Sequence, residues 1–278
     1  MSNLIRPQDL YTELTSPSLR IVDTRFDLQD PKAGRQAYRE AHLPGAIYFD
    51  LDEDLSTPPG RHGGRHPLPD MEAFAVRLGQ AGIGNDSSVV VYDDSGGMFA
   101  GRFWWMLRYL GHGKVKLLDG GFTAWQAAGF EVTGEIPTFD STEFKASVQA
   151  EMMVDREYVM RRLDDPGLLL IDARAAERYR GEVEPIDSQA GHIPSAINLP
   201  FAGNLREGRF KPAEELRKRY AVTEEVEEVV LYCGSGVSAA HNLIALEEAG
   251  IRGAKLYLGS WSDWCSFRDA PIATGEDG

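Results

Sequence analysis

The sequence predicts an α/β protein of two homologous domains, each a mostly parallel β-sheet with helices on both faces. Two observations lead to this prediction. Short apolar runs alternate with helical stretches, and strands that are apolar at every position are typical of a parallel sheet covered on both sides. The same series of motifs also occurs twice in the same order, at an interval of roughly 140–150 residues.

Four pairs of segments define the repeat. They are Ile21–Arg25 with Ile171–Arg174, Ala41–Ile47 with Gly191–Ile197, Ser88–Tyr92 with Val229–Tyr232, and Val115–Trp125 with Ala254–Trp264. In the first half, helices are expected over Met71–Ala81 and Gly101–Tyr109. Residues 130–153 show no helical period and are expected to form a linker. We therefore place the domain boundary near residue 145, which gives domains of residues 1–145 and 146–278.

Composition narrows the classes of function. The chain has 278 residues, a net charge of −14 and two cysteines. The negative charge argues against nucleic acid or an anionic membrane as a partner. No apolar run reaches the ~18 residues of a membrane span, and neither a secretory signal nor a disulfide framework is visible. A cytoplasmic location is expected. Neither a metal nor a cofactor is expected, because no metal-ligand spacing or nucleotide-binding fingerprint occurs.

The most informative residue is Cys233, which follows the apolar run Val229–Tyr232 and precedes a helical stretch, Ala239–Gly250. Gly234 and Gly236 allow the chain between them to curl tightly. Successive N–H groups of such a loop, with a helix N-terminus behind them, form a nest for an anion. The pattern predicts a nucleophilic thiolate. The alternative is an inert cysteine packed at the end of a strand.

The repeat contains its own comparison for this residue. When the two halves are aligned, Asp93 stands at the position of Cys233. The first domain therefore has the scaffold without the nucleophile, and we expect it to be catalytically inactive.

Several of these motifs together resemble the tandem rhodanese-type sulfurtransferases, which include thiosulfate and 3-mercaptopyruvate sulfurtransferases. The resemblance extends from about Leu19 to Thr274. It rests on Gly191–Pro194, Asp119–Gly121, Gly259–Trp264 and the loop after Cys233. It implies transfer of a sulfane sulfur from a small anionic donor to cyanide, a thiol or a thioredoxin-like protein, through a persulfide on the cysteine.

The loop itself resembles the mercaptopyruvate branch of that family, because no Lys or Arg follows the cysteine before Arg252. That branch implies a Ser–His–Asp relay, whose matching positions here are Ser235, His66 and Asp52. His62 is a competing candidate for the histidine.

The resemblance also implies residues that bind the substrate. In the loop these are Gly234, Gly236, Val237 and Ser238. Two arginines hold the donor carboxylate in mercaptopyruvate enzymes, and Arg178 matches the first. The second falls near residues 184–187, where this chain has no arginine. The identity of the donor, thiosulfate or 3-mercaptopyruvate, therefore stays open.

Two other classes of function were weighed. A cysteine phosphatase needs an arginine six residues after the cysteine, and that position is Ala239. A noncatalytic binding or sulfur-relay module, fed with persulfide by a partner protein, is the main alternative.

Overall fold

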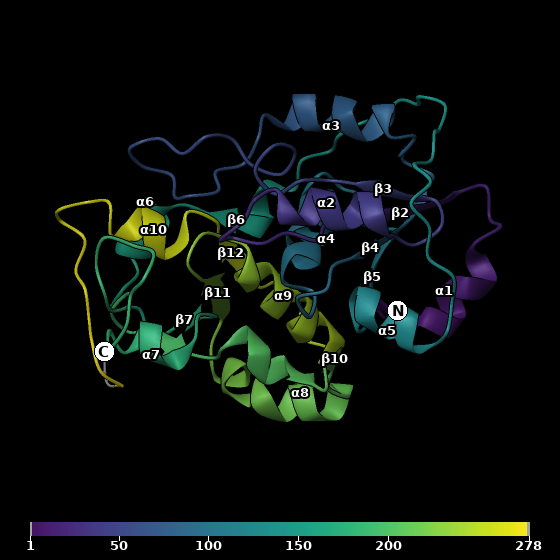
Figure 1. Cartoon of the computed structure of the whole chain (residues 1–278). Coiled ribbons are helices and arrows are strands. Elements are labelled where there is room, and N and C mark those ends of the chain that lie inside the picture. Colours follow the sequence, from purple (N-terminus) through teal and green to yellow (C-terminus); the bar gives the residue numbers. More distant parts are fainter. Residues whose placement is uncertain (1, 277–278) are drawn as a thin grey trace. The chain divides into compact units, whose positions relative to one another are not determined.

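The computed structural model describes residues 2–276 and divides into two compact units (Figure 1). The first contains Met1–Thr57 and Leu68–Gln149, and the second contains Pro58–Pro67 and Ala150–Gly278. The expected domain boundary near residue 145 lies a few residues before the observed division between Gln149 and Ala150. Residues 58–67, which we expected in the first domain, pack with the second unit. The reason is a set of hydrogen bonds to the second unit that is described with the site below.

The first unit is built on a five-stranded sheet of order β1-β5-β4-β2-β3, in which every pair of neighbours is parallel. Helix α4 packs on β4 and β5. The strands are β1 Leu4–Ile5, β2 Leu19–Asp23, β3 Ala46–Tyr48, β4 Ser88–Tyr92 and β5 Val115–Leu118, and the helices are α1 Pro7–Glu13, α2 Ala33–Glu40, α3 Met71–Gln80, α4 Met98–Tyr109 and α5 Gly121–Ala127.

The second unit repeats this plan, with a parallel sheet of order β6-β12-β11-β7-β8 and a separate antiparallel hairpin, β9–β10. Helix α9 packs on β11 and β12, and α8 packs against α9 (Figure 1). The strands are β6 Met153–Val154, β7 Leu168–Asp172, β8 Ile197–Asn198, β9 Leu205–Arg206, β10 Arg209–Phe210, β11 Glu228–Tyr232 and β12 Lys255–Tyr257, and the helices are α6 Arg156–Met160, α7 Ala176–Tyr179, α8 Ala213–Arg219, α9 Ser238–Glu248 and α10 Ser260–Trp264. Short 3-10 turns cover Ala150–Met152, Phe201–Asn204 and Ala221–Glu225.

The register of the central strands confirms the repeat. In the first unit Asp23 pairs with Tyr92, and in the second Asp172 pairs with Tyr232. Both tyrosine hydroxyls are buried and each accepts a backbone N–H from the turn after the repeated histidine. Burial raises the pKa of both tyrosines well above the usual range. The two halves of the sequence therefore fold into two parallel α/β sheets of the same topology, as predicted.

Helix boundaries follow the sequence prediction closely. Helix α3 ends one residue before the expected Ala81 and is capped by Asp70, whose carboxylate accepts the Ala73 N–H at 2.8 Å. Helix α4 starts at Met98, earlier than the expected Gly101. The helix starts earlier because N–H groups of its first turn donate to the carboxylate of Asp93, which follows β4. The apolar pattern of the sequence does not reveal this contact.

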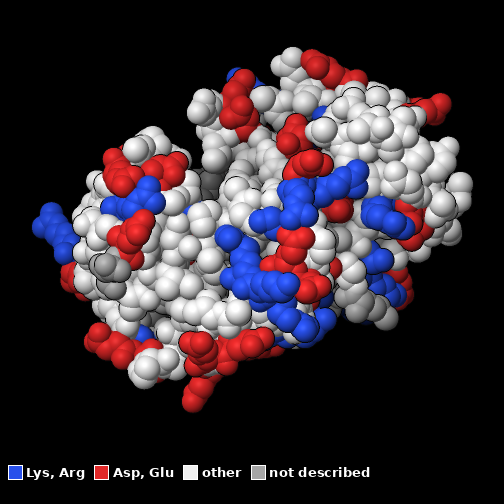
Figure 2. All heavy atoms as spheres, turned by 90° about the horizontal axis from the view of Figure 1, so that it is seen from below, with Lys and Arg blue, Asp and Glu red and all other residues white. Residues whose placement is uncertain are grey.

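The described residues contain no helix long and apolar enough to cross a membrane. Charges of both signs are mixed on the face seen in Figure 2 rather than separated into large patches of one sign. Lys218 and Glu214 form an exposed ion pair at 2.9 Å.

Candidate active site

Cys233 lies directly after β11, at the carboxyl end of the central strand of the second sheet. Cys233 is almost completely buried, with 1% of its surface exposed. The loop of residues 234–237 follows, and α9 starts at Ser238. Gly236 has φ +75°, which a residue with a side chain rarely adopts. The strand–loop–helix arrangement that the sequence predicted around Cys233 is therefore present.

The backbone of Cys233 is held by the turn that starts α10. Its N–H donates to Ser260 Oγ at 3.1 Å, and its carbonyl accepts the Trp261 N–H at 2.9 Å. The next carbonyl, of Gly234, accepts the Ser262 N–H at 2.9 Å. Ser260 itself is fully buried and has φ +57°, in the left-handed region. These bonds fix the direction in which the cysteine side chain leaves the strand.

The first unit shows what this kind of loop does with an anionic side chain. Asp93 follows β4 as Cys233 follows β11, and its carboxylate is fully buried. It accepts four backbone N–H bonds at 2.8–2.9 Å, from Ser95, Gly97, Phe99 and Ala100. Burial raises the pKa of Asp93 overall, although these N–H groups act in the opposite direction. The loop N–H groups therefore converge on one acceptor at the end of the strand.

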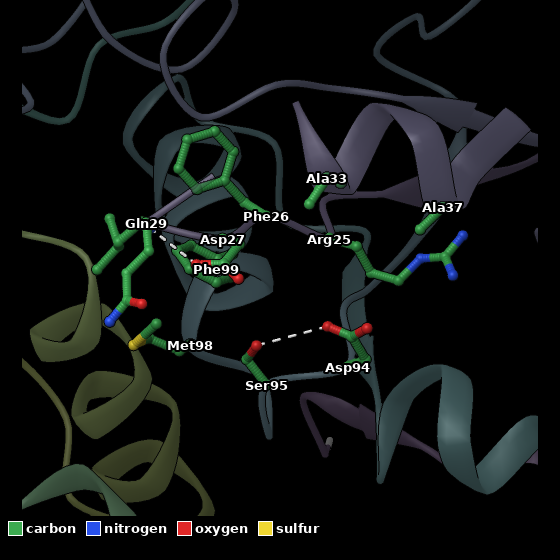
Figure 3. A pocket seen from close by; sticks show the side chains of 12 residues that line it. Arg25, Phe26, Asp27, Gln29, Ala33, Ala37, Asp94, Ser95, Met98 and Phe99 are labelled. Atoms are coloured by element: carbon green, nitrogen blue, oxygen red, sulfur yellow. Dashed lines mark hydrogen bonds between the residues drawn. The ribbon is translucent and has the colours of Figure 1, made fainter. Parts of the chain in front are cut away.

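The same loop of the first unit borders a cavity of about 600 Å³ (Figure 3). Residues at the carboxyl ends of β2 and β4 line it, among them Arg25, Asp94 and Ser95. In Figure 3 the Ser95 hydroxyl points to the Asp94 carboxylate, to which it is hydrogen-bonded. Burial raises the pKa of Asp94, while Arg25 lowers it. No cysteine is among the lining residues, so this cavity lacks a thiol nucleophile.

In the second unit the loop meets a histidine from a distant segment. His66 Nδ1 lies 2.8 Å from Ser235 Oγ, and both residues are buried. The segment that carries His66 is anchored on α10, because Asp263 Oδ1 accepts the Gly63 N–H at 2.6 Å. A side chain at Gly64 would come within 2.5 Å of the Gly259 carbonyl, so only glycine fits there. The glycine-rich stretch is thus a docked segment rather than a solvated loop.

The competing histidine takes a different position. His62 Nδ1 lies 2.7 Å from Ser266 Oγ, and its ring stacks on Phe267 with centroids 3.9 Å apart. Of the two histidines, His66 is the one in contact with Ser235. Asp52 belongs to the first unit, in the turn after β3, where burial and the nearby carboxylates of Asp50 and Glu53 raise its pKa. Its part in a relay stays a prediction.

Two arginines lie over the loop beside Cys233. A methyl group built on Gly234 would be 2.9 Å from Nη2 of Arg65 and 3.5 Å from Nη1 of Arg178. Arg178 was expected here from the sequence. Arg65 was not, although it directly precedes the histidine that was singled out. Its position directly before His66 was the one available signal, but adjacency in the chain does not by itself place a side chain at the loop.

Residues 184–187, where a second arginine was sought, contain acceptors instead. Glu184 accepts bonds from Arg178 at 2.7 and 3.2 Å. Asp187 accepts one from Arg178 at 3.0 Å and another from Arg65. Both carboxylates are 4% exposed. Arg65, from another part of the chain, is thus the second arginine beside this loop.

Comparison with known proteins supports the same reading of the fold. A model of the rhodanese-like domain matches residues 6–128 and again residues 155–267. The chain belongs to the rhodanese family. Apart from residues 58–67, which pack with the second unit, the first match lies in the first unit and the second match in the second unit.

Relatives of this rhodanese are enzymes of sulfur transfer. It is 46% identical over 282 residues to a probable 3-mercaptopyruvate sulfurtransferase of Pseudomonas aeruginosa, with 99% of each chain covered. It is 36% identical over 268 residues to the thiosulfate sulfurtransferase of Rattus norvegicus, covering 93% of this chain and 88% of the relative. The crystal structure of SseA from Escherichia coli, described as a 3-mercaptopyruvate sulfotransferase, superimposes with a TM-score of 0.81 at 32% identity. That match covers 94% of this chain and all of the other.

The protein is therefore a sulfurtransferase with tandem rhodanese domains, which confirms the predicted enzyme class. Its relatives include proteins named for 3-mercaptopyruvate and proteins named for thiosulfate. Within residues 2–276, no group of three or more His, Cys, Asp or Glu side chains is arranged to hold a metal ion.

Proposed function

We propose that this rhodanese moves a sulfane sulfur from 3-mercaptopyruvate or thiosulfate to a thiophilic acceptor through a persulfide on Cys233. Cyanide, a small thiol and a reduced thioredoxin-like protein are the acceptors of this chemistry. The first domain, residues 1–145 in the sequence prediction, is proposed to be noncatalytic because Asp93 stands in place of the cysteine.

The observation that carries this proposal is the bonding of Asp93. Four loop N–H groups converge on its carboxylate at 2.8–2.9 Å. The repeat makes the N–H groups of Ser235, Val237 and Ala239 the equivalents in the second unit, whereas that of Ala240, the fourth, donates to the Val237 carbonyl at 3.2 Å. N–H groups aimed at a sulfur favour its thiolate and stabilise a negatively charged terminal sulfur. The hydroxyls of Ser235 and Ser238 add further donors.

The transfer takes two displacement steps. The Cys233 thiolate attacks the outer sulfur of thiosulfate, or the single thiol sulfur of 3-mercaptopyruvate, and forms an S–S bond. With thiosulfate, the donor's S–S bond breaks and sulfite leaves with the electron pair. With 3-mercaptopyruvate, a C–S bond breaks and pyruvate leaves as its enolate, which must take up a proton. The acceptor then attacks the terminal sulfur, and the electron pair of the persulfide bond returns to Cys233.

The two donors therefore differ in their need for a proton. Sulfite is stable as an anion, whereas an enolate is a strong base and leaves readily only when it is protonated. The contact between His66 and Ser235 supports a role for this pair as the proton source. Asp52 would orient His66, as the resemblance implies.

The decisive test measures thiocyanate formation by one preparation with each donor and cyanide. We expect turnover without any partner protein, and an intact-mass increase of one sulfur atom after donor is added alone. The ratio of kcat/KM for the two donors then assigns the preferred one. Turnover that requires a partner protein to deliver persulfide would support the relay-module alternative instead.

Replacing His66 by glutamine should separate the donors. We expect kcat with 3-mercaptopyruvate to fall by about 10²–10⁴-fold, the range of general acid catalysis, and kcat with thiosulfate to change only a few-fold. The matched control is His62→Gln, because His62 contacts Ser266 rather than Ser235. Equal losses with both donors would show that His66 supports the loop rather than donating a proton.

A further inference from the structure

Asp187 forms a bridge between the two arginines above the loop. Its Oδ2 accepts a bond from Arg178 Nη2 at 3.0 Å, and its Oδ1 accepts one from Arg65 Nη1. The two guanidinium groups come from segments far apart in the sequence, and both lie against Gly234, next to Cys233. A single carboxylate thus connects two cations, with one oxygen on each, beside the proposed nucleophile.

Glu184, the other carboxylate beside these arginines, has a different role from Asp187. Its carboxylate accepts backbone N–H bonds from Ile186 and Asp187 at 3.1 and 3.0 Å, in addition to its bonds with Arg178. Burial alone would raise the pKa of Glu184, but the bonds from Arg178 and the two N–H groups lower it overall. Glu184 therefore closes the turn and fixes Arg178 in place. Asp187 is bonded through its side chain to the two arginines.

We propose that Arg65 is the second arginine that binds the donor carboxylate, and that Asp187 occupies this carboxylate site until the donor displaces it. The inference rests on the proposed function. It adds Arg65 as a donor-binding residue and the exchange of the Asp187 carboxylate for that of the donor. It assigns 3-mercaptopyruvate as the preferred donor.

The geometry supports this exchange in two ways. The Asp187 carboxylate is a covalently attached copy of the group that the donor presents, so the arginine pair is already shaped for it. The pair also lies over Gly234, so that a carboxylate held there places the sulfur end of a small donor near Cys233. On binding, the donor carboxylate takes over the bonds to the two guanidinium groups, and the displaced Asp187 carboxylate must turn outward to be hydrated by solvent.

The test compares four variants with the wild type, using 3-mercaptopyruvate and cyanide. Arg65→Gln should raise KM for the donor by about 10- to 100-fold, the loss of a charge-assisted bond, with kcat changed only a few-fold. Asp187→Asn should lower KM several-fold, because an amide competes poorly for the arginines. The double variant should keep the high KM of Arg65→Gln. Arg180→Gln, which removes a half-exposed arginine paired with Glu182, is the matched control and should keep the wild-type KM.

Two results would overturn the inference. If the double variant returned to the wild-type KM, Arg65 would serve only to neutralise Asp187 and would not bind the donor. If Asp187→Asn raised KM as Arg65→Gln does, Asp187 would orient the arginines rather than take the place of the donor. Thermal unfolding of each variant shows whether a loss comes from misfolding.

Failure of the inference is distinguishable from failure of the proposed function. Turnover of thiosulfate but not of 3-mercaptopyruvate would contradict the proposed carboxylate site, while the proposed sulfur transfer would still stand. If neither donor were used, the proposed function would fail. Titration calorimetry with pyruvate would still test Arg65, because Arg65→Gln should weaken binding of its carboxylate about 10-fold or more.

Discussion

Replacing Cys233 by serine is expected to reduce sulfur transfer by at least about 10⁴-fold with either donor, since the covalent intermediate is lost. A serine hydroxyl is far less acidic than a thiol, and the loop N–H groups cannot make it a comparable nucleophile. The variant should also gain no mass when donor is added. Thiocyanate formation and intact-mass measurement on the same samples check both expectations.

The control for this prediction is the other cysteine of the chain. Cys265 follows α10, and burial raises the pKa of its thiol. Its sulfur contacts the Ser188 hydroxyl at 3.7 Å and the Ser262 carbonyl at 3.9 Å, and the backbone N–H groups of Ser188 and Gln189 do not offset the effect of burial on its pKa. Cys265→Ser should therefore keep its turnover. A Cys233→Ser variant that retained turnover would exclude the persulfide mechanism.

The largest effect on stability is expected at the ion pair that ends β7. Arg174 donates to Asp172 Oδ2 and to the Gly191 carbonyl, both at 2.6 Å, and its guanidinium lies 4.8 Å from the ring centre of Trp261. The two charged side chains are 1% and 0% exposed. Arg174→Ala leaves a buried carboxylate without its partner. We expect the free energy of unfolding to fall by about 3–5 kcal/mol.

Urea denaturation monitored by tryptophan fluorescence measures this loss, because Trp261 lies beside the substituted residue. A loss of this size is a large part of the ~5–15 kcal/mol that stabilises a typical domain. Lys218→Ala, which breaks an exposed pair with Glu214, should leave the midpoint unchanged. An unchanged midpoint for Arg174→Ala as well would show that neighbouring groups compensate the Asp172 charge.

Local sequence patterns were sufficient for much of the site. The apolar strand, the glycines and the helix after Cys233 are consecutive in the chain, so their arrangement follows from short-range backbone preferences. The comparison of Asp93 with Cys233 also needed only the repeat. The structure adds the direct observation that the first-domain loop directs four N–H groups to its carboxylate.

Contacts between distant segments were less predictable. The sequence did not show what residues 58–67 pack on, because a glycine- and proline-rich composition is typical of loops whether or not they are solvated. The structure anchors this segment on α10 through Gly63 and Asp263. That anchoring brings His66 to Ser235 and sends His62 to Ser266. Two histidines four positions apart could not be separated without it.

The sequence by itself determined the two-domain α/β fold, the sulfurtransferase class and the residue proposed as nucleophile. The fold and the nucleophile follow from patterns within a strand, loop or repeat, and the class follows from the resemblance of several motifs together to the rhodanese-type sulfurtransferases. Only the tertiary structure decided that Arg65 joins Arg178 above the loop, with Asp187 between them. The physical reason is that an arginine can be supplied to a charged site from any segment that folds over it. Spacing along the chain therefore does not constrain where that residue stands in the sequence.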